Sequence, residues 1–162
     1  MAQAHTDLSE HTPAHPYASF IGEVQRPGRY LGQEFGTAVK DWAAADARIA
    51  FAFPDIYEVA MSHMGTKILY KVVNDQPDLL LDRVMMPWTD MEEKLREEGV
   101  PLVSLEHRKA LRDFDVVGFS LQFELTYTNV LAMLDLGGIP IEAEERGIDM
   151  PLVIAGGPTA TH

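Results

Sequence analysis

Apolar residues along this chain gather in short continuous runs that are separated by longer stretches of helical periodicity. The clearest runs lie at residues 48–53, 79–87, 115–121 and 151–158. A strand that is covered on both faces of a sheet shows such a run, whereas a half-exposed strand shows strict alternation. We therefore predict four buried strands, together with a short strand or edge segment at residues 101–105.

Amphipathic helices are predicted between the runs. The core-facing stripe of the first helix steps by three and four residues through Tyr57, Met61, Met64, Ile68 and Val72. A second helix is predicted at residues 89–99, where Thr89 and Glu92 have the spacing of a capping box. A further helix is predicted within residues 122–138.

The order of these elements predicts the fold class. Strands that alternate with helices require crossover connections, which give a mostly parallel sheet with helices on both faces. The domain is predicted at residues 30–162. Residues 1–29 are polar and interrupted by three prolines, so we expect a flexible lead with little packing and no metal site.

Charge and composition narrow the classes of function. The chain has 25 acidic and 13 basic residues and a net charge of −12, which disfavours nucleic acid and anionic membranes as partners. No stretch approaches the roughly 20 apolar residues of a membrane span, and the N-terminus lacks the pattern of a secretory signal. The absence of cysteine excludes an iron–sulfur cluster held by this chain's own thiolates and agrees with a cytoplasmic location, which we predict.

Ligands bind at the edge of a parallel sheet where the carboxyl ends of its strands meet. Three predicted loops reach this edge, at residues 54–57, 120–122 and 156–158. The candidate binding residues are Asp55, Tyr57, Ser120, Gln122, Gly156, Gly157 and Pro158. Two successive glycines let a backbone approach a ligand closely, although a structural turn uses the same residues. No dinucleotide-binding or P-loop glycine motif is present.

Several candidates also have a purely structural interpretation. Asp55 and Glu58 suit an acid–base pair, but their spacing matches helix capping better. Ser120 and Gln122 either hydrogen-bond a ligand or satisfy backbone groups at a strand end. His63 is interpreted as an exposed helix residue, with a role as a ligand or proton carrier as the alternative.

Four long stretches of the chain read RIAFAFPDIYEVAMSHMGTKILYKVVN, RVMMPWTDMEEKLREEGVPLVSLE, DFDVVGFSLQFELTYTNVLAMLDLGGIP and PLVIAGGP. Together and in this order they resemble the N-terminal region of a poorly characterised family of radical SAM proteins, over about residues 30–158. The resemblance implies a flavodoxin-like, Rossmann-like domain of the cobalamin-binding type, with the corrin across the carboxyl edge of the sheet. It also implies a partner barrel that holds a [4Fe–4S] cluster and cleaves S-adenosylmethionine.

The chain departs from that family in three respects. It has no barrel and no cysteine, so S-adenosylmethionine and [4Fe–4S] are expected only in a full-length parent. The family's sheet continues with another helix and a fifth strand, so we expect a truncated domain whose uncovered apolar surface promotes self-association. The cobalamin motif Asp-x-His-x-x-Gly is also absent, because no histidine has an aspartate two residues before it.

Three hypotheses remain open from the sequence. The first is a cobalamin-binding-type module that precedes a radical SAM barrel, is not catalytic on its own, and uses the candidate residues to hold the corrin or its nucleotide tail. The second is a domain that binds no cofactor and docks onto the barrel. The third is a small nucleotide-binding or response-regulator-like domain, although the paired acids of phosphoacceptor domains are missing after the first strand.

Overall fold

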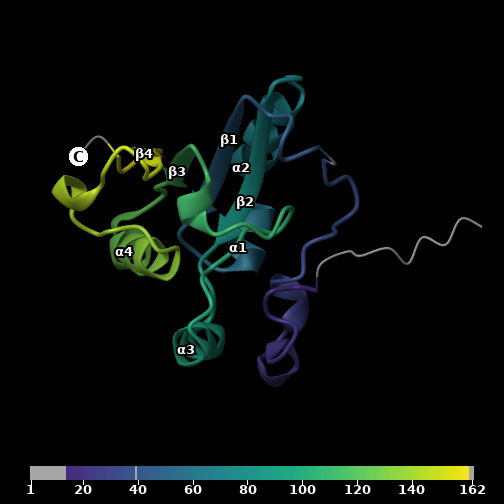
Figure 1. The fold of residues 1–162 in the computed structure, drawn as a ribbon, viewed down its shortest axis with the longest axis vertical. Helices are drawn as coiled ribbons and strands as arrows, with labels where there is room; N and C mark the ends of the chain where they lie inside the picture. The colour runs from purple at the N-terminus through teal and green to yellow at the C-terminus, as the bar shows by residue number, and fades with distance from the viewer. Residues whose placement is uncertain (1–13, 39, 161–162) are drawn as a thin grey trace, which may run out of the picture.

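Strands and helices alternate along the residues that the computed structural model describes, 14–38 and 40–160 (Figure 1). The strands are β1 (Ala47–Phe53), β2 (Leu79–Met85), β3 (Val116–Ser120) and β4 (Leu152–Gly156). The α-helices are α1 (Tyr57–Ser62), α2 (Met64–Asn74), α3 (Thr89–Glu98) and α4 (Tyr127–Leu136). Short 3-10 helices lie in the connections: η1 (Ile21–Glu23), η2 (Pro27–Arg29), η3 (Leu111–Asp113), η4 (Glu124–Thr126) and η5 (Ala143–Glu145).

The strands form one parallel sheet in the order β2-β1-β3-β4. Phe51 on β1 pairs with Arg83 on β2 and with Gly118 on β3, and Gly118 pairs with Ile154 on β4. At least one α-helix lies in each connection between successive strands, as crossovers between parallel strands require. The predicted Rossmann-like, flavodoxin-like α/β fold with a parallel sheet is confirmed. Because every strand runs in the same direction, all four carboxyl ends lie at one edge.

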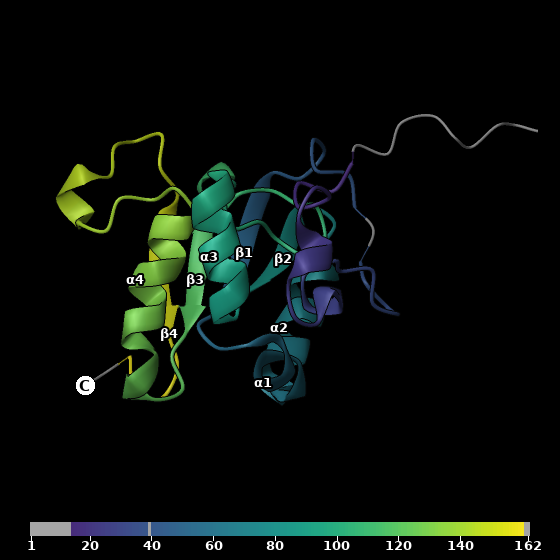
Figure 2. The same cartoon turned by 90° about the horizontal axis from the view of Figure 1, so that it is seen from below.

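Helices cover the two faces of this sheet unequally. On one face, α3 and α4 pack against the larger core cluster, and Met91 and Leu95 of α3 are buried as their periodicity predicts (Figure 2). On the other face, α1 and α2 pack against a smaller cluster that includes Phe51, Phe53 and Leu81 of β1 and β2. The second face is therefore covered mainly over the β1–β2 half of the sheet.

The N-terminal lead packs more than its sequence suggests. Tyr17, Phe20 and Val24 are buried, with 1%, 2% and 6% of their surface exposed, in the core cluster that also contains α3 residues. The Tyr17 hydroxyl accepts the backbone N–H of Val103 at 2.8 Å. The expectation of little packing is wrong for this part of the lead, because its apolar side chains meet those of α3. Residues 1–13 lie outside the described residues, and the domain boundary stays a prediction.

The first predicted helix is interrupted at His63. The backbone of His63 is extended, with φ −76° and ψ 119°, so that α1 ends before it and α2 begins after it. Met64, Ile68 and Val72 were predicted to face the core, but they are 66%, 55% and 54% exposed. After the interruption, α2 instead packs Tyr70 against the smaller core cluster. The predicted continuous stripe is therefore wrong beyond His63.

Apolar surface is left open beside the edge strand β4. Leu152 and Ile154 on this strand are 63% and 50% exposed, and Leu69 on α2 is 46% exposed. The strand itself contains neither a charged residue nor a proline, the features that usually protect an exposed edge from pairing. This arrangement agrees with the predicted uncovered apolar surface, while self-association through it stays a prediction.

Candidate functional site

A cavity of about 390 Å³ opens near the carboxyl edge of the sheet, between the start of α2 and the ends of β3 and β4. Its lining residues are Phe51, His63, Gly65, Leu69, Gly118, Phe119, Ser120, Gln122, Ile154, Ala155, Gly156 and Gly157. Most of them are apolar or glycine, with a few polar groups at one end. This composition is typical of sites for small molecules or for one arm of a larger ligand.

The polar groups of this edge cavity come from β3, the following loop and the α1–α2 junction. The Gln122 side-chain amide donates a hydrogen bond to the Ser120 hydroxyl at 2.8 Å. His63 is half-buried, and its ring centroid lies 5.5 Å from that of Phe53. The Nδ1 atom of His63 is buried and has no hydrogen-bond partner in the described part of the chain. Because a buried polar atom without a partner is costly, His63 is a candidate ligand contact.

Two glycines leave part of the edge cavity's wall bare. A Cβ atom at Gly156 would meet nothing within 4 Å, and one at Gly118 would meet only the Ile154 side chain, at 3.7 Å. The packing of the fold therefore does not require glycine at either position. Glycine in the interior of a strand often marks the close approach of a ligand or another backbone, which makes these two positions candidate contact points.

Gly157 has a different role from its neighbour. Its φ is +119°, and a Cβ atom there would overlap the carbonyl oxygen of Leu121. The loop is held further by the Leu121 N–H, which donates to the Gly156 carbonyl at 2.7 Å, and by the Tyr127 hydroxyl, which donates to the Thr159 carbonyl at 2.8 Å. The turn therefore requires glycine at position 157, whereas it would tolerate a side chain at position 156.

The structure brings four of the seven sequence-predicted residues together. Ser120, Gln122, Gly156 and Gly157 line the edge cavity, and Ser120 pairs with Gly156 in the sheet register. Pro158 is exposed and lies outside the lining. The loops after β3 and β4 come together because these strands are neighbours, so that their ends lie side by side, while a binding role for these residues stays a prediction.

Tyr57 does not join the edge cavity. Its hydroxyl donates to Glu34 Oε1 at 2.9 Å, on the side of the sheet that carries β2. Burial and the hydrogen bond to Glu34 raise the pKa of Tyr57 to about 12, so the phenol stays protonated at neutral pH. Its separation from the edge cavity follows from α1, which begins at Tyr57 and directs this side chain toward the smaller core cluster.

Asp55 also lies outside the lining of the edge cavity, and it does not cap α1. Its Oδ1 atom accepts the N–H of Ile56, the next residue, at 2.7 Å, and the N-cap position belongs to Ile56. Glu58 forms ion pairs with Arg26 and Arg29 at 2.8 and 2.9 Å. The predicted capping pair is therefore wrong, because the helix begins one residue later than the spacing suggested.

Sequence reasoning did not select several residues of the edge cavity. Phe51 and Ile154 lie in predicted buried strands and Leu69 lies outside the predicted helix stripe, so no local pattern marked them as a cavity wall. Gly118 carried a usable signal, because a glycine in the middle of an apolar strand run is unfavourable without a specific reason. The exposed-helix interpretation of His63 is also wrong, since the interruption between α1 and α2 places its ring against Phe53.

A cluster of charged side chains is buried along β2, inside a run that reads as apolar. Asp82 has 0% of its surface exposed, accepts the Ser104 hydroxyl at 2.6 Å and lies 2.7 Å from His107 Nδ1. Arg83 donates from Nε to Glu106 Oε1 at 2.6 Å. These contacts bind residues 104–107 to β2, so the cluster stabilises the fold.

The charged cluster predicts how stability depends on pH. Burial raises the pKa of Glu106 to about 7, and the hydrogen bond to Asp82 raises the pKa of His107. Both groups therefore keep a proton in the folded state that the unfolded chain has already released. Their contribution is complete below the ordinary values of 4.5 and 6.5 and is lost as the pH rises through the folded values.

We expect the free energy of unfolding to fall by roughly 2 kcal/mol between about pH 5 and pH 8. Urea unfolding of the wild type, Glu106→Gln and His107→Gln at several pH values measures it. In Glu106→Gln, the free energy of unfolding should no longer fall below about pH 7. In His107→Gln, it should no longer fall above about pH 6.5. Asp75→Asn, at an exposed ion pair with Lys71, is the control and should keep the wild-type slope. A wild-type stability that rises across this interval would contradict the argument.

The described residues contain no group of three or more His, Asp or Glu side chains that could hold a metal ion. In the same part of the chain, every helix is too short or too polar to cross a membrane.

Comparison with protein families gives a decisive match. The family described as "Radical SAM proteins, N-terminal" matches residues 65–162, more than half of the chain. The chain belongs to this family. The radical SAM N-terminal match begins in α2 and extends through β4, so it contains all residues of the edge cavity except Phe51 and His63. Comparison with curated proteins and with solved structures gives no match.

Membership in the radical SAM family defines the context of the edge cavity. An N-terminal region of this family implies that a parent protein contains a radical SAM region as its partner. The edge cavity and the open apolar surface beside β4 lie next to each other, since Leu69 and Ile154 contribute to both. A ligand held in the edge cavity would therefore lie next to a surface that is available for contact with that region.

Proposed function

We propose that this chain is the cobalamin-binding-type module of a radical SAM protein and that it is not catalytic on its own. The observation that carries the proposal is the edge cavity, which lies beside the carboxyl ends of β3 and β4 in a parallel sheet. Open α/β sheets bind their ligands at this edge. S-adenosylmethionine and a [4Fe–4S] cluster belong to the parent's partner region, because this chain has no cysteine to ligate iron.

The residues of the edge cavity fit a part of cobalamin. The space of about 390 Å³ suits one arm of the cofactor, such as its nucleotide tail, with the corrin lying across the sheet edge. Bare glycines at positions 118 and 156 leave room against the strands, and Ser120 and Gln122 offer hydroxyl and amide groups for hydrogen bonds. When bound, cobalamin would supply a redox-active cobalt centre to the partner region.

His63 is the titratable side chain in the lining of the edge cavity, but it lacks the aspartate that usually orients a cobalt-binding histidine. Its unpartnered Nδ1 suits a hydrogen bond to the ligand. We therefore assign His63 a contact role and not the role of lower cobalt ligand. A His63→Gln variant, which keeps an amide for hydrogen bonding, should retain most of the binding.

The test is a titration with hydroxocobalamin, followed by absorbance and by retention of the cofactor on a desalting column. The wild type should retain cobalamin, and the double variant Gly118→Ala/Gly156→Ala should bind at least about tenfold more weakly, because the two methyl groups fill the bare wall. The matched control is Gly22→Ala/Gly147→Ala, at positions where a Cβ atom also meets nothing within 4 Å but which lie outside the edge cavity. If the wild type retains no cofactor, the proposal is wrong.

The open apolar surface favours a second candidate function, a domain that docks onto the radical SAM region without binding a cofactor. Leu152 and Ile154 on β4 are 63% and 50% exposed and Leu69 is 46% exposed, which is unusual for apolar residues grouped beside a sheet edge. This second function differs from the first because it does not use the edge cavity. It requires that the glycine double variant behave as the wild type in every assay, including association with the partner region.

A further inference from the structure

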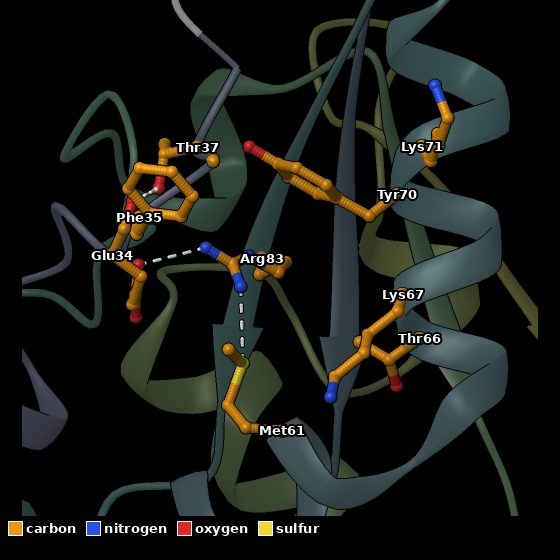
Figure 3. Close-up of a pocket in the computed structure, with 10 residues that line it drawn as sticks. Glu34, Phe35, Thr37, Met61, Thr66, Lys67, Tyr70, Lys71 and Arg83 are labelled. Carbon is orange, nitrogen blue, oxygen red and sulfur yellow. Dashed lines mark hydrogen bonds and ion pairs between the residues drawn. The ribbon is translucent and has the colours of Figure 1, made fainter.

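A second cavity, of about 260 Å³, lies on the opposite flank of α2 from the edge cavity, under the loop of residues 34–37 (Figure 3). Its lining residues are Glu34, Phe35, Gly36, Thr37, Met61, Thr66, Lys67, Tyr70, Lys71 and Arg83. Figure 3 shows the side chains of Arg83, Met61 and Lys67 converging between this loop and α2. We call this space the strap cavity, because the loop of residues 34–37 closes one side of it.

Arg83 forms the floor of the strap cavity and keeps spare donor capacity. Only 8% of its side chain is exposed, and a guanidinium has five N–H groups. Two of them have strong acceptors, at Glu106 Oε1 (2.6 Å) and Glu34 Oε2 (3.0 Å). A third points to the Met61 sulfur at 3.2 Å, which is a weak acceptor. A buried guanidinium with this incomplete set of partners can donate further hydrogen bonds to a ligand carboxylate.

The strap cavity is lined by both positive and negative side chains, and their pairing indicates which charges a ligand should carry. Glu106 is 2% exposed and pairs with Arg83, and Lys71 pairs with Asp75 at 2.8 Å on the surface. Lys67 has no ion pair within the described residues. Among the described residues, Lys67 is therefore the unpaired cation at the mouth, and Glu34 is the carboxylate beside it, shared between Arg83 at 3.0 Å and the Tyr57 hydroxyl at 2.9 Å. A simple anion would be repelled by Glu34, whereas a ligand with both charges matches both groups.

Aromatic and apolar groups complete the strap cavity. The Phe35 ring is fully exposed, and the Tyr70 ring lies against the Arg83 guanidinium, whose central carbon is 4.6 Å from the ring centroid. Met61 adds a flexible apolar side chain beside them. An aromatic ring that is bare at the mouth of a cavity gains contact area when an apolar ligand group packs on it.

We propose that the strap cavity binds a free α-amino acid with an apolar side chain. The ligand carboxylate would lie between Arg83 and Lys67, its ammonium group at Glu34, and its side chain against Phe35 and Tyr70. The volume of the cavity suits a molecule of this size. The inference does not depend on cobalamin, because the strap cavity and the edge cavity share no lining residue.

The test is a titration of the isotope-labelled protein by NMR with L-phenylalanine, phenylacetate and phenethylamine. The last two probes lack the ammonium group and the carboxylate, respectively. L-phenylalanine should shift the amide signals of Gly36 and Thr37 saturably, with a dissociation constant in the millimolar range expected for about twelve non-hydrogen atoms. Each single-charge probe should bind at least about fivefold more weakly, because each loses one charge-assisted contact.

Two substitutions of exposed side chains, Phe35→Ala and Lys67→Gln, test the binding site without disturbing the folded core. Phe35→Ala removes a fully exposed ring and should weaken L-phenylalanine binding several-fold without changing stability, while Ile148→Ala, at another fully exposed side chain, is the control and should change neither. Lys67→Gln should weaken L-phenylalanine and phenylacetate but not phenethylamine. The proposal is overturned if the three probes shift the same signals equally, if no shift saturates, or if Phe35→Ala binds as tightly as the wild type.

Discussion

Asp82→Ala is expected to lower the free energy of unfolding by about 3–5 kcal/mol, the largest effect that we predict for a single substitution in this protein. Asp82 is fully buried and accepts hydrogen bonds from the Ser104 hydroxyl at 2.6 Å and the His107 backbone N–H at 3.0 Å. Its other carboxylate oxygen lies 2.7 Å from His107 Nδ1. Without the carboxylate, the buried Ser104 hydroxyl and the two N–H groups of the half-buried His107 lose their acceptor.

Urea unfolding followed by tryptophan fluorescence measures this loss. Asp75→Ala is the matched control, because Asp75 pairs with Lys71 on the surface and its removal should change stability by less than about 0.5 kcal/mol. Should Asp82→Ala not fold, Ser104→Ala removes only one side-chain hydroxyl, which donates to Asp82 and accepts the Lys109 N–H, and should cost about 1–2 kcal/mol. An Asp82→Ala protein as stable as the Asp75→Ala control would show that the charged cluster does not hold residues 104–107 on β2.

Gly157→Ala and Gly156→Ala should differ sharply although the two positions are adjacent. Gly157 has φ +119°, and a Cβ atom there would overlap the Leu121 carbonyl oxygen, so we expect a loss of about 2–4 kcal/mol. A Cβ atom at Gly156 would meet nothing within 4 Å, so Gly156→Ala should stay within about 1 kcal/mol of the wild type.

Thermal unfolding and amide hydrogen exchange distinguish the two glycine variants. The Leu121 N–H donates to the Gly156 carbonyl at 2.7 Å, and its exchange should accelerate in Gly157→Ala because the loop must move away from Leu121. Gly156→Ala should leave this exchange rate unchanged. If the two variants were equally stable, the turn would tolerate a side chain at position 157, and the fold would not require glycine there.

That the loops after β3 and β4 line one cavity was predictable, whereas the position of the loop after β1 was not. Ser120 and Gly156 end neighbouring parallel strands, and the rule that such ends share an edge requires only strand direction. Asp55 and Tyr57 also follow a strand that ends at this edge. However, α1 starts at once and directs Tyr57 to Glu34, 2.9 Å away. The direction of a helix after a turn depends on packing, which no local pattern encodes.

The packing of the N-terminal lead illustrates a signal that sequence reasoning overlooked. Tyr17, Phe20 and Val24 are spaced by three and four residues, the same periodicity that correctly predicted Met91 and Leu95 of α3 as buried. The prolines on both sides favoured a flexible segment. In the structure, the buried apolar area outweighs the effect of those prolines, because these side chains join the main core.

By itself, the amino-acid sequence determined the four strands of the sheet, their parallel arrangement, and the resemblance to the N-terminal region of radical SAM proteins, whereas the segment predicted at residues 101–105 forms only an isolated bridge between Val103 and Ala110. These properties follow from burial along single segments, which continuous apolar runs record directly. Tertiary structure decided that Met64, Ile68 and Val72 face outward, that the His63 ring forms a cavity wall, and that Asp82 meets His107. Such features depend on how distant segments are placed against one another, and the energy of each contact exists only once both partners are in position.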